Sequence, residues 1–217
     1  LTGYLGAGKT TLLNAIGGML KPTGGNVLWK DKNIAAMNDK ERTGYRRDAV
    51  GFIFQQMFMM KNLSILDNIM LPAIESKKTT ESRSEKQTRA EVLMRKLGII
   101  EVADNDINEV SGGQLQRACI CRSMMNNPEI LFADEPTGAL NRQASAEVID
   151  VLGKLNSEGT TIMMVTHDSK VAARCKRVLY IVDGNIKGEY NLGEVGDDST
   201  MRERERTLNN WLMELGW

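Results

Sequence analysis

The chain has 217 residues, and its 28 Lys and Arg are balanced by 28 Asp and Glu, so the formal net charge is zero. A neutral chain without a basic block argues against a nucleic-acid clamp, and we expect no nucleic-acid partner. No apolar run approaches the roughly 18 residues of a membrane-spanning helix, and no signal peptide is apparent. We therefore expect one domain, or a domain with a lobe, that contacts a membrane only through partners.

The first motif runs from Gly3 to Thr10 and matches the P-loop pattern G-x-x-x-x-G-K-[ST]. Its glycines let successive N–H groups form an anion nest, and a helix expected over Gly8–Leu20 directs its positive end at the same anion. Lys9 is expected to reach the β- and γ-phosphates of a nucleotide, and the Thr10 hydroxyl to complete a Mg²⁺ shell. The predicted nucleotide-binding residues of this motif are Gly3, Gly6, Ala7, Gly8, Lys9, Thr10 and Thr11.

The next elements begin with a turn at Pro22–Gly25, which leads into a hairpin expected near Val27–Lys32. A strand is expected at Ala49–Phe54, followed by a helical stretch from Lys61 to about Asn127. Within that stretch, Ser76–Arg89 is polar and charged, which predicts a solvated loop entering a surface helix.

Strands and helices alternate again in the second half of the chain. We expect a strand at Glu129–Asp134, a helix at Arg142–Asn156, and strands at Thr160–Thr166 and Arg177–Asp183. This alternation predicts an α/β fold, a P-loop NTPase core whose mostly parallel sheet carries helices on both faces, with an inserted α-helical subdomain.

Two acids follow the buried strand at the carboxyl end, where parallel sheets bind ligands. Asp134 is expected to hold Mg²⁺ directly or through water, and Glu135 to polarise the attacking water as general base. Acid pairs at strand ends are often solvated turns, but the upstream P-loop favours the catalytic interpretation. His167 is the only histidine and closes the next strand, so it is predicted to hydrogen-bond the γ-phosphate, although lone histidines are more often structural.

Three further segments carry a family resemblance. Ser111–Arg117, with the sequence SGGQLQR, resembles the signature motif of ATP-binding-cassette (ABC) ATPases. Glu135–Asn141 resembles the Walker B extension and D-loop of these cassettes, while Gln55 matches their Q-loop and His167 their H-loop. The resemblance implies in-line attack of water on the γ-phosphate of ATP, with Gln55 as a further Mg²⁺ and water contact.

The signature also implies a second subunit. Ser111, Gly112 and Gly113, together with Gln114, are expected to form a second anion nest at a helix N-terminus. In the family this nest binds the γ-phosphate held by another cassette, so two ATP molecules lie between head-to-tail subunits. The resemblance therefore implies a homodimer that ATP closes and hydrolysis opens, driving integral membrane permease subunits from the cytoplasmic face of the cell membrane.

The segment after Gln55 contacts the transport partner in this family. For Met57–Met60 two interpretations stay open, contact with such a partner or packing in the helical subdomain's own core. For Leu63 and Ile65 we predict packing in that core.

The chain closes with Ser199–Gly216, which has apolar residues at helical spacing and Gly216 as the expected stop. We expect an amphipathic helix docked on its own domain; the alternative is a site for a partner or a second protomer. This tail, together with Leu71–Ala73, resembles the lipoprotein, macrolide and antimicrobial-peptide exporter group of cassettes, which implies an exporter.

The resemblance implies an ABC ATPase domain over residues 1–190. Its RecA-like core covers 1–60 and 128–190, its helical subdomain 61–127, and the C-terminal tail 191–217. Cys119, Cys121 and Cys175 lack metal-binding spacing and are predicted to be reduced packing residues.

Two departures from the family pattern leave alternatives open. Leu1 stands directly before the P-loop, so we expect an N-terminally truncated cassette without the leading strands and the A-loop aromatic. Asn141 replaces the usual Asp of the D-loop and keeps its size but not its charge. These departures favour a nucleotide-binding subunit with impaired turnover, whereas Glu135 and His167 oppose it. A soluble ABC-type ATPase acting on DNA or the ribosome is the other alternative, but coiled-coil insertions, tandem cassettes and basic arms are missing.

Overall fold

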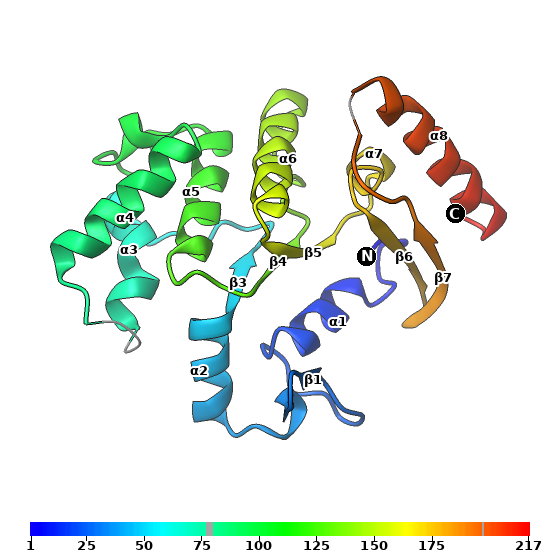
Figure 1. The fold of residues 1–217 in the computed structure, drawn as a ribbon, viewed down its shortest axis with the longest axis horizontal. Coiled ribbons are helices and arrows are strands. Elements are labelled where there is room, and N and C mark those ends of the chain that lie inside the picture. Colours follow the sequence, from blue (N-terminus) through cyan, green and yellow to red (C-terminus); the bar gives the residue numbers. More distant parts are fainter. Residues whose placement is uncertain (77–79, 197) are drawn as a thin grey trace. The chain divides into compact units, whose positions relative to one another are not determined.

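The computed structural model describes residues 1–76, 80–196 and 198–217, and the chain forms two compact units (Figure 1). Unit 1 comprises Leu1–Asn14 and Met164–Trp217, and unit 2 comprises Ala15–Met163. The loop expected within Ser76–Arg89 falls partly on residues 77–79, which lie outside the described residues.

Unit 2 is built on two parallel strands, β3 (Val50–Ile53) and β4 (Ile130–Asp134). β5 (Thr161–Val165), which begins in this unit, completes the strand order β3-β4-β5. Every residue of β4 before Asp134 is buried, as its continuous apolar sequence predicts. The α/β fold with a parallel sheet is therefore confirmed.

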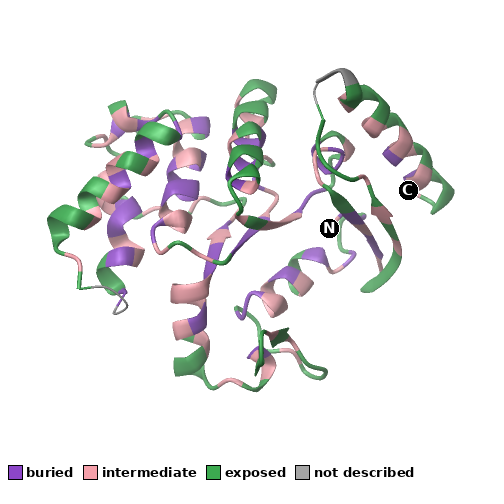
Figure 2. Cartoon of the chain, in the orientation of Figure 1, coloured by how far each residue is buried: buried purple, intermediate pink, exposed green. Residues whose placement is uncertain are grey.

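The helical part of unit 2 consists of α3 (Ile65–Glu75), α4 (Arg83–Lys96), a 3₁₀ turn η2 (Ile100–Val102) and α5 (Gly112–Met124). Figure 2 shows buried positions on the facing sides of α3 and α5 and exposed positions along α4. Ile65 is fully buried, so its predicted place in this core is confirmed, whereas Leu63 is half-buried.

Serine side chains start all three of these helices. Ser64, Ser82 and Ser111 are the N-caps of α3, α4 and α5, and each side chain accepts a hydrogen bond from the third N–H of its helix. Such caps satisfy N–H groups that the helix itself leaves unpaired, each contributing about 1 kcal/mol.

The remaining elements of unit 2 are shorter or more polar. The predicted hairpin is present as β1 (Leu28–Trp29) and β2 (Lys32–Asn33), followed by the 3₁₀ turn η1 (Ile34–Ala36). α6 (Arg142–Ser157) lies where the sequence indicates. α2 (Asp39–Ala49) was not predicted, because it is strongly polar and buries only Tyr45.

The helix after the P-loop is shorter than expected. α1 covers Lys9–Ile16 rather than Gly8–Leu20. Gly18 adopts a φ of 73°, and its N–H donates to the Ala15 carbonyl at 3.2 Å. A left-handed glycine terminates a helix at low cost, which explains the early end.

Unit 1 places the start of the chain between two strands. The Thr2 N–H donates to Leu179 O and its carbonyl accepts from Ile181, both at 2.9 Å, in a parallel bridge to β6 (Arg177–Val182). On the other side the Leu1 carbonyl accepts the Thr166 N–H at 3.0 Å. Leu1 and Thr2 thus occupy a strand position immediately before the P-loop.

β6 pairs antiparallel with β7 (Asn185–Asn191), and α7 (Ser169–Ala172) precedes β6. β7 was not predicted, and it runs one residue into the segment assigned to the C-terminal tail. Its sequence NIKGEYN is largely exposed and polar, so it lacks the apolar signal of a buried strand. The predicted boundaries of core, helical subdomain and tail stay a prediction.

The C-terminal helix α8 (Asp198–Glu214) packs on its own unit, as expected. Its fully buried Leu208 and Leu212 join a cluster with Val178 and Tyr180 of β6. Figure 2 shows the buried positions of α8 on its side toward β6 and β7.

One arginine ties α8 to the preceding loops. The Arg204 guanidinium donates to Ala173 O at 3.1 Å and to Leu192 O at 2.7 Å, and it also reaches the carbonyls of Cys175, Gly193 and Glu194. A planar guanidinium satisfies several carbonyls at once, so this contact fixes the position of the helix start.

The three cysteines behave as packing residues. Burial raises the pKa of Cys119 to about 11 and of Cys121 to about 12, and it also raises the pKa of Cys175.

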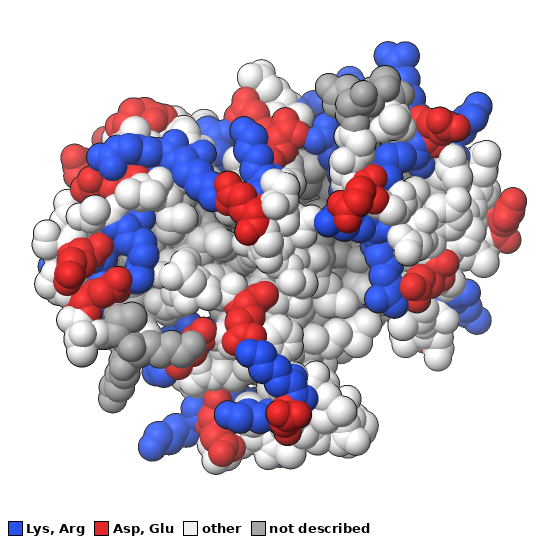
Figure 3. Space-filling view, viewed as in Figure 1, with Lys and Arg blue, Asp and Glu red and all other residues white. Residues whose placement is uncertain are grey.

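Lys and Arg lie interspersed with Asp and Glu on the face shown in Figure 3. In the part of the chain that the structure describes, helices of the length and apolarity needed to cross a bilayer are absent.

Replacing Arg204 with Met keeps the length of the side chain but removes every donor to these carbonyls. We expect Arg204→Met to lower the free energy of unfolding by about 2 kcal/mol, because several carbonyls lose their partner together. Urea denaturation followed by circular dichroism measures this. The control Arg206→Met, at an exposed position of the same helix, should change it by less than about 0.5 kcal/mol; equal losses would contradict the anchoring role of Arg204.

Candidate nucleotide-binding site

The P-loop has the left-handed glycines that an anion nest needs. Gly3, Gly6 and Gly8 have φ values of 155°, 82° and 89°. A Cβ on Gly3 would lie 2.2 Å from the Ile181 carbonyl oxygen, so only glycine fits there. The two glycines of the pattern, Gly3 and Gly8, and the additional Gly6 thus all adopt conformations that favour glycine.

The P-loop lysine is folded back onto its own loop. The Lys9 side chain is 7% exposed, and Nζ donates to the carbonyls of Gly3 and Tyr4, each at 2.7 Å. The Tyr4 carbonyl also accepts the Ala7 N–H at 3.2 Å. The ammonium therefore lies inside the curve of the loop, while Thr10 and Thr11 are exposed in the first turn of α1.

His167 follows β5 in the same unit as the P-loop. It is exposed, and its neighbour Asp168 caps α7. Because Thr166 hydrogen-bonds Leu1, the segment between β5 and His167 runs beside the residues that lead into the P-loop. Unit 1 thus brings together two of the predicted segments.

Unit 2 brings together Gln55 and the acid pair. β3 and β4 pair in parallel with Ile53 opposite Ala133, so Gln55 and Glu135 each lie two residues beyond this pair at the same sheet edge. Glu135 has a φ of 47°, a left-handed conformation that is uncommon for a residue with a side chain. Its carbonyl accepts the Gly138 N–H at 3.0 Å, which closes a tight turn after the strand.

The Gln55 side chain lies against Gly138. A Cβ on Gly138 would meet the amide nitrogen of Gln55 at 2.9 Å. The absence of a side chain at Gly138 therefore leaves the room that the Gln55 amide occupies. No role was predicted for this glycine beyond membership of the segment after Glu135.

The signature serine and glutamine bond each other. The Ser111 hydroxyl accepts the Gln114 N–H at 3.2 Å, and the Gln114 side chain accepts the Ser111 N–H at 2.9 Å, forming a capping box. The cap leaves the first turn of α5, with Gly112 and Gly113, at the wall of a hollow of about 370 Å³. That hollow is lined by Ser111, Gly112, Gly113, Ala139, Leu140, Asn141, Gln143, Ala144 and Glu147.

An acid in this hollow is neutralised by a neighbour. Arg117 donates to Glu147, and this hydrogen bond holds the pKa of the Glu147 carboxyl below its ordinary value. Arg117 and Glu147 thus form an ion pair. It adds little repulsion to an anion at the N-terminus of α5.

Asn141, in the segment that resembles a D-loop, is the N-cap of α6. Its side chain accepts the Ala144 N–H at 2.9 Å, the geometry of an N-cap. Asp forms the same cap, so the replacement that departs from the family pattern retains this contact.

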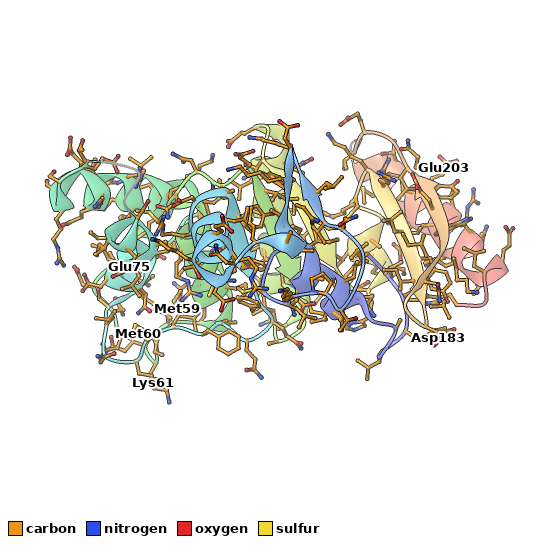
Figure 4. The ribbon with its side chains drawn as sticks, turned by 90° about the horizontal axis from the view of Figure 1, so that it is seen from below. Met59, Met60, Lys61, Glu75, Asp183 and Glu203 are labelled. Atoms are coloured by element: carbon orange, nitrogen blue, oxygen red, sulfur yellow. The ribbon has the colours of Figure 1, made fainter. Side chains whose placement is uncertain are left out.

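The segment after Gln55 is held by its backbone and exposes side chains. The buried Asn68 amide accepts from the Met60 N–H at 2.7 Å and donates to the Met60 carbonyl at 3.0 Å, and Arg122 donates to Phe58 O at 2.8 Å. The side chains of Phe58 and Met60 are 64% and 49% exposed. Met59, Met60 and Lys61 lie together at one margin of the helical part (Figure 4).

The roles of Asn68 and Arg122 were not predicted, because their hydrogen bonds to the Met60 and Phe58 backbone join residues eight or more positions apart. Nearby, a groove of about 340 Å³ carries apolar side chains and three arginines. It is lined by Met19, Thr43, Arg46, Arg47, Val50, Gly51, Phe52, Phe54, Pro72, Arg122, Ser123 and Asn126.

Removing the cap at Asn141 should destabilise α6. We expect Asn141→Ala to cost about 1 kcal/mol of unfolding free energy, and Asn141→Asp to cost less than about 0.5 kcal/mol, because Asp caps equally well and favours the positive helix end. Chemical denaturation of the three proteins decides this. A loss with Asp as large as that with Ala would show that the cap is not what Asn141 contributes.

The family described as ABC transporter matches residues 1–138 of the chain. The chain is similar to the "Macrolide export ATP-binding/permease protein MacB" of Campylobacter jejuni subsp. jejuni, with 38% identity over 96% of this chain and 32% of that protein. It is also similar to the "Pyoverdine export ATP-binding/permease protein PvdT" of Pseudomonas fluorescens, with 40% identity over 86% of this chain and 28% of that protein. The chain thus spans about a third of the length of these relatives.

Solved cassettes are similar to this chain in fold as well as in sequence. The dimeric bacterial ABC transporter cassette MJ0796 superposes with a TM-score of 0.82 at 38% identity, covering 89% of this chain and 84% of that one. A dimeric post-hydrolysis state of MJ0796 bound to ADP and Pi gives a TM-score of 0.81 at 37% identity over the same shares. Motifs, fold and relatives agree, and the chain belongs to the ABC transporter family as an ATP-binding cassette.

Proposed function

We propose that this chain is the ATP-binding and hydrolysing part of a membrane exporter, and that it works as a head-to-tail dimer around two Mg-ATP. The proposal is supported by the positive-φ glycines of the P-loop and by the capped start of α5, which we interpret as two separate anion nests in one chain. A single triphosphate has one γ-phosphate, so the second nest is accounted for by the nucleotide of a second subunit.

The P-loop residues have a direct role in this proposal. The N–H groups of the loop bind the phosphates, and Lys9 exchanges the carbonyls of Gly3 and Tyr4 for phosphate oxygens. Both carbonyls lie at 2.7 Å from the ammonium, so the exchange needs only a short movement of a side chain that is already at the loop.

The metal-binding residues proposed are Thr10, Asp134 and Gln55. Hydroxyl, carboxylate and amide oxygens are ligands that Mg²⁺ accepts, and this ion usually completes its shell with phosphates and water. Among the described residues, groups of three or more His, Cys, Asp or Glu that could hold a metal by themselves are absent, which fits a metal that arrives with the nucleotide. When bound, Mg²⁺ neutralises charge that develops on the phosphates.

The proposed chemistry uses Glu135 and His167. Glu135 accepts a proton from the attacking water, and His167 hydrogen-bonds the γ-phosphate. The left-handed backbone of Glu135 supports a functional role, since strained conformations concentrate at sites of chemistry.

The head-to-tail arrangement is supported from two sides. In this chain Ser111, Gly112 and Gly113 line the same hollow as the D-loop residue Asn141, where a partner's phosphate and loop would meet both. Two solved structures of the similar cassette MJ0796 are described as dimeric, one of them with ADP and Pi.

An exporter is supported by the relatives, whose names join an ATP-binding part to a permease. We propose that the cassette drives integral membrane permease segments from the cytoplasmic face, peripheral to the membrane. The substrate class proposed is that of lipoprotein, peptide or macrolide-type molecules.

The groove of unit 2 is the proposed docking site for the permease. Phe52 and Phe54 line this groove. The Phe54 ring contacts the exposed Phe58 ring edge-on, with 5.6 Å between the ring centroids. Arg46, Arg47 and Arg122 complete its lining. A short helix with apolar and acidic side chains matches this combination of apolar surface and positive charge.

Blocking hydrolysis should trap the dimer. We expect Glu135→Gln to be monomeric alone and dimeric with Mg-ATP, because the nucleotide stays intact between the two subunits. Adding Ser111→Arg should abolish that dimer, since the side chain fills the second nest. Size-exclusion chromatography with light scattering measures the mass.

The outcomes separate the parts of the proposal. A Glu135→Gln protein that binds ATP yet stays monomeric would overturn the dimer mechanism. A dimer that persists with Ser111→Arg would show that the contact does not use the signature nest.

A methyl group at Gly138 should displace the Gln55 amide. We expect Gly138→Ala to lower ATP turnover about tenfold with little change in nucleotide affinity, because small misplacements of a contact to the metal and water slow the chemical step. Gly153→Ala, at an exposed position of α6 with open space around it, is the matched control and should retain full turnover. Undiminished turnover in Gly138→Ala would remove Gln55 from the catalytic set.

A further inference from the structure

Tyr4, the second residue of the P-loop, contacts the far end of the chain. Its hydroxyl donates to the Gly216 carbonyl at 2.8 Å, and its ring stacks on the Trp217 indole with centroids 5.7 Å apart and planes 22° apart. All three residues belong to unit 1. Neither contact is needed for an anion nest, since the nest is made of backbone N–H groups.

The end of α8 has a defined geometry that presents Trp217. Gly216 has a φ of 89° and its N–H donates to Met213 O at 3.0 Å, while the Trp217 N–H donates to Leu212 O at 3.0 Å. These two bonds form a Schellman motif, in which the residue after the left-handed glycine folds back onto the last turns of the helix. The indole is therefore directed by the helix end and does not hang from a free tail.

Trp217 also contacts the sheet beneath it. Its ring lies 5.7 Å from that of the fully buried Tyr180 at an angle of 50°. Tyr180 is the residue of β6 that bridges Thr2, next to the P-loop. Tyr180, Trp217 and Tyr4 form a row of three rings, which we call the aromatic clasp.

The aromatic clasp includes Tyr4, whose carbonyl oxygen accepts a hydrogen bond from the P-loop lysine. The Tyr4 carbonyl accepts both the Lys9 ammonium at 2.7 Å and the Ala7 N–H at 3.2 Å. Fixing the Tyr4 side chain restricts the rotation of its own backbone and so the direction of this carbonyl.

We propose that Trp217 is a positioning residue for nucleotide binding, which holds Tyr4 and through it the P-loop in its anion-binding shape. The inference rests on the proposed function of the P-loop as an ATP site. Three glycines leave this loop little stiffness of its own, so part of its conformational entropy is lost when a triphosphate binds. A loop that the aromatic clasp has already ordered loses less conformational entropy when a triphosphate binds, which raises the affinity for the nucleotide.

The test compares Trp217, which follows the end of α8, with Trp211, which lies within this helix. Trp217→Ala in the 217-residue chain should raise the Kd for Mg-ATP about three- to tenfold, the range that the loss of one aromatic pair gives. The KM should rise with it while kcat stays within about twofold, because the reacting groups are untouched. Trp211→Ala is the matched control, since that ring contacts Tyr190 of β7 at 5.2 Å instead. Isothermal titration and steady-state turnover supply the three constants.

Two milder variants keep the test decisive if the alanine change unfolds α8. Tyr4→Phe removes only the hydroxyl that bonds Gly216, and Trp217→Phe keeps a smaller ring; each should raise the Kd about two- to threefold. In a chain with Trp29→Phe and Trp211→Phe, Trp217 is the only one of three tryptophans left, and its emission should change on nucleotide binding.

The outcomes distinguish this inference from the proposed function. A wild-type chain that binds ATP, with the same Kd in the Trp217 and Tyr4 variants, would overturn the clasp alone. An equal loss of affinity in Trp211→Ala would do the same, since it would assign the effect to the packing of α8 in general. A wild-type chain that binds no nucleotide would overturn the proposed function and the clasp together.

Discussion

The backbone pairing of Leu1 and Thr2 with the strands on either side of them is the constraint on which the arrangement of unit 1 depends. Their backbone bonds connect β6 on one side to the end of β5 on the other. Gly3 then passes so close to the Ile181 carbonyl that a side chain has no room. The P-loop is thereby held at the sheet edge where α/β proteins bind ligands, and His167 leaves the neighbouring strand at the same edge.

Much of this fold can be predicted from the sequence, because its signals are local. The P-loop glycines, the apolar run before Asp134 and the spacing of apolar residues in α8 each predict an element that the structure contains. The family was identified on short motifs, and the comparisons confirm it. The individual site residues keep the status of proposals.

Other features depend on contacts that a single segment does not reveal. α2 and β7 lack an apolar face strong enough to predict, and their place is set by caps and by pairing with β6. The importance of Gly138 follows only from its contact with the Gln55 side chain, which is distant in sequence. The role of Gly216 as a helix stop was predictable, but its carbonyl bond to Tyr4 spans 212 positions and leaves no local pattern.

The backbone of Glu135 has a consequence for how this protein can change by mutation. A φ of 47° costs a side-chain-bearing residue of order 1 kcal/mol, a cost that glycine escapes and asparagine tolerates. Replacement of Glu135 by glycine or asparagine, which cannot accept a proton, is therefore expected to raise thermal stability. With Glu135 as the proposed general base, selection for stability alone would favour its loss, and the carboxylate at this turn would persist only where turnover itself is selected.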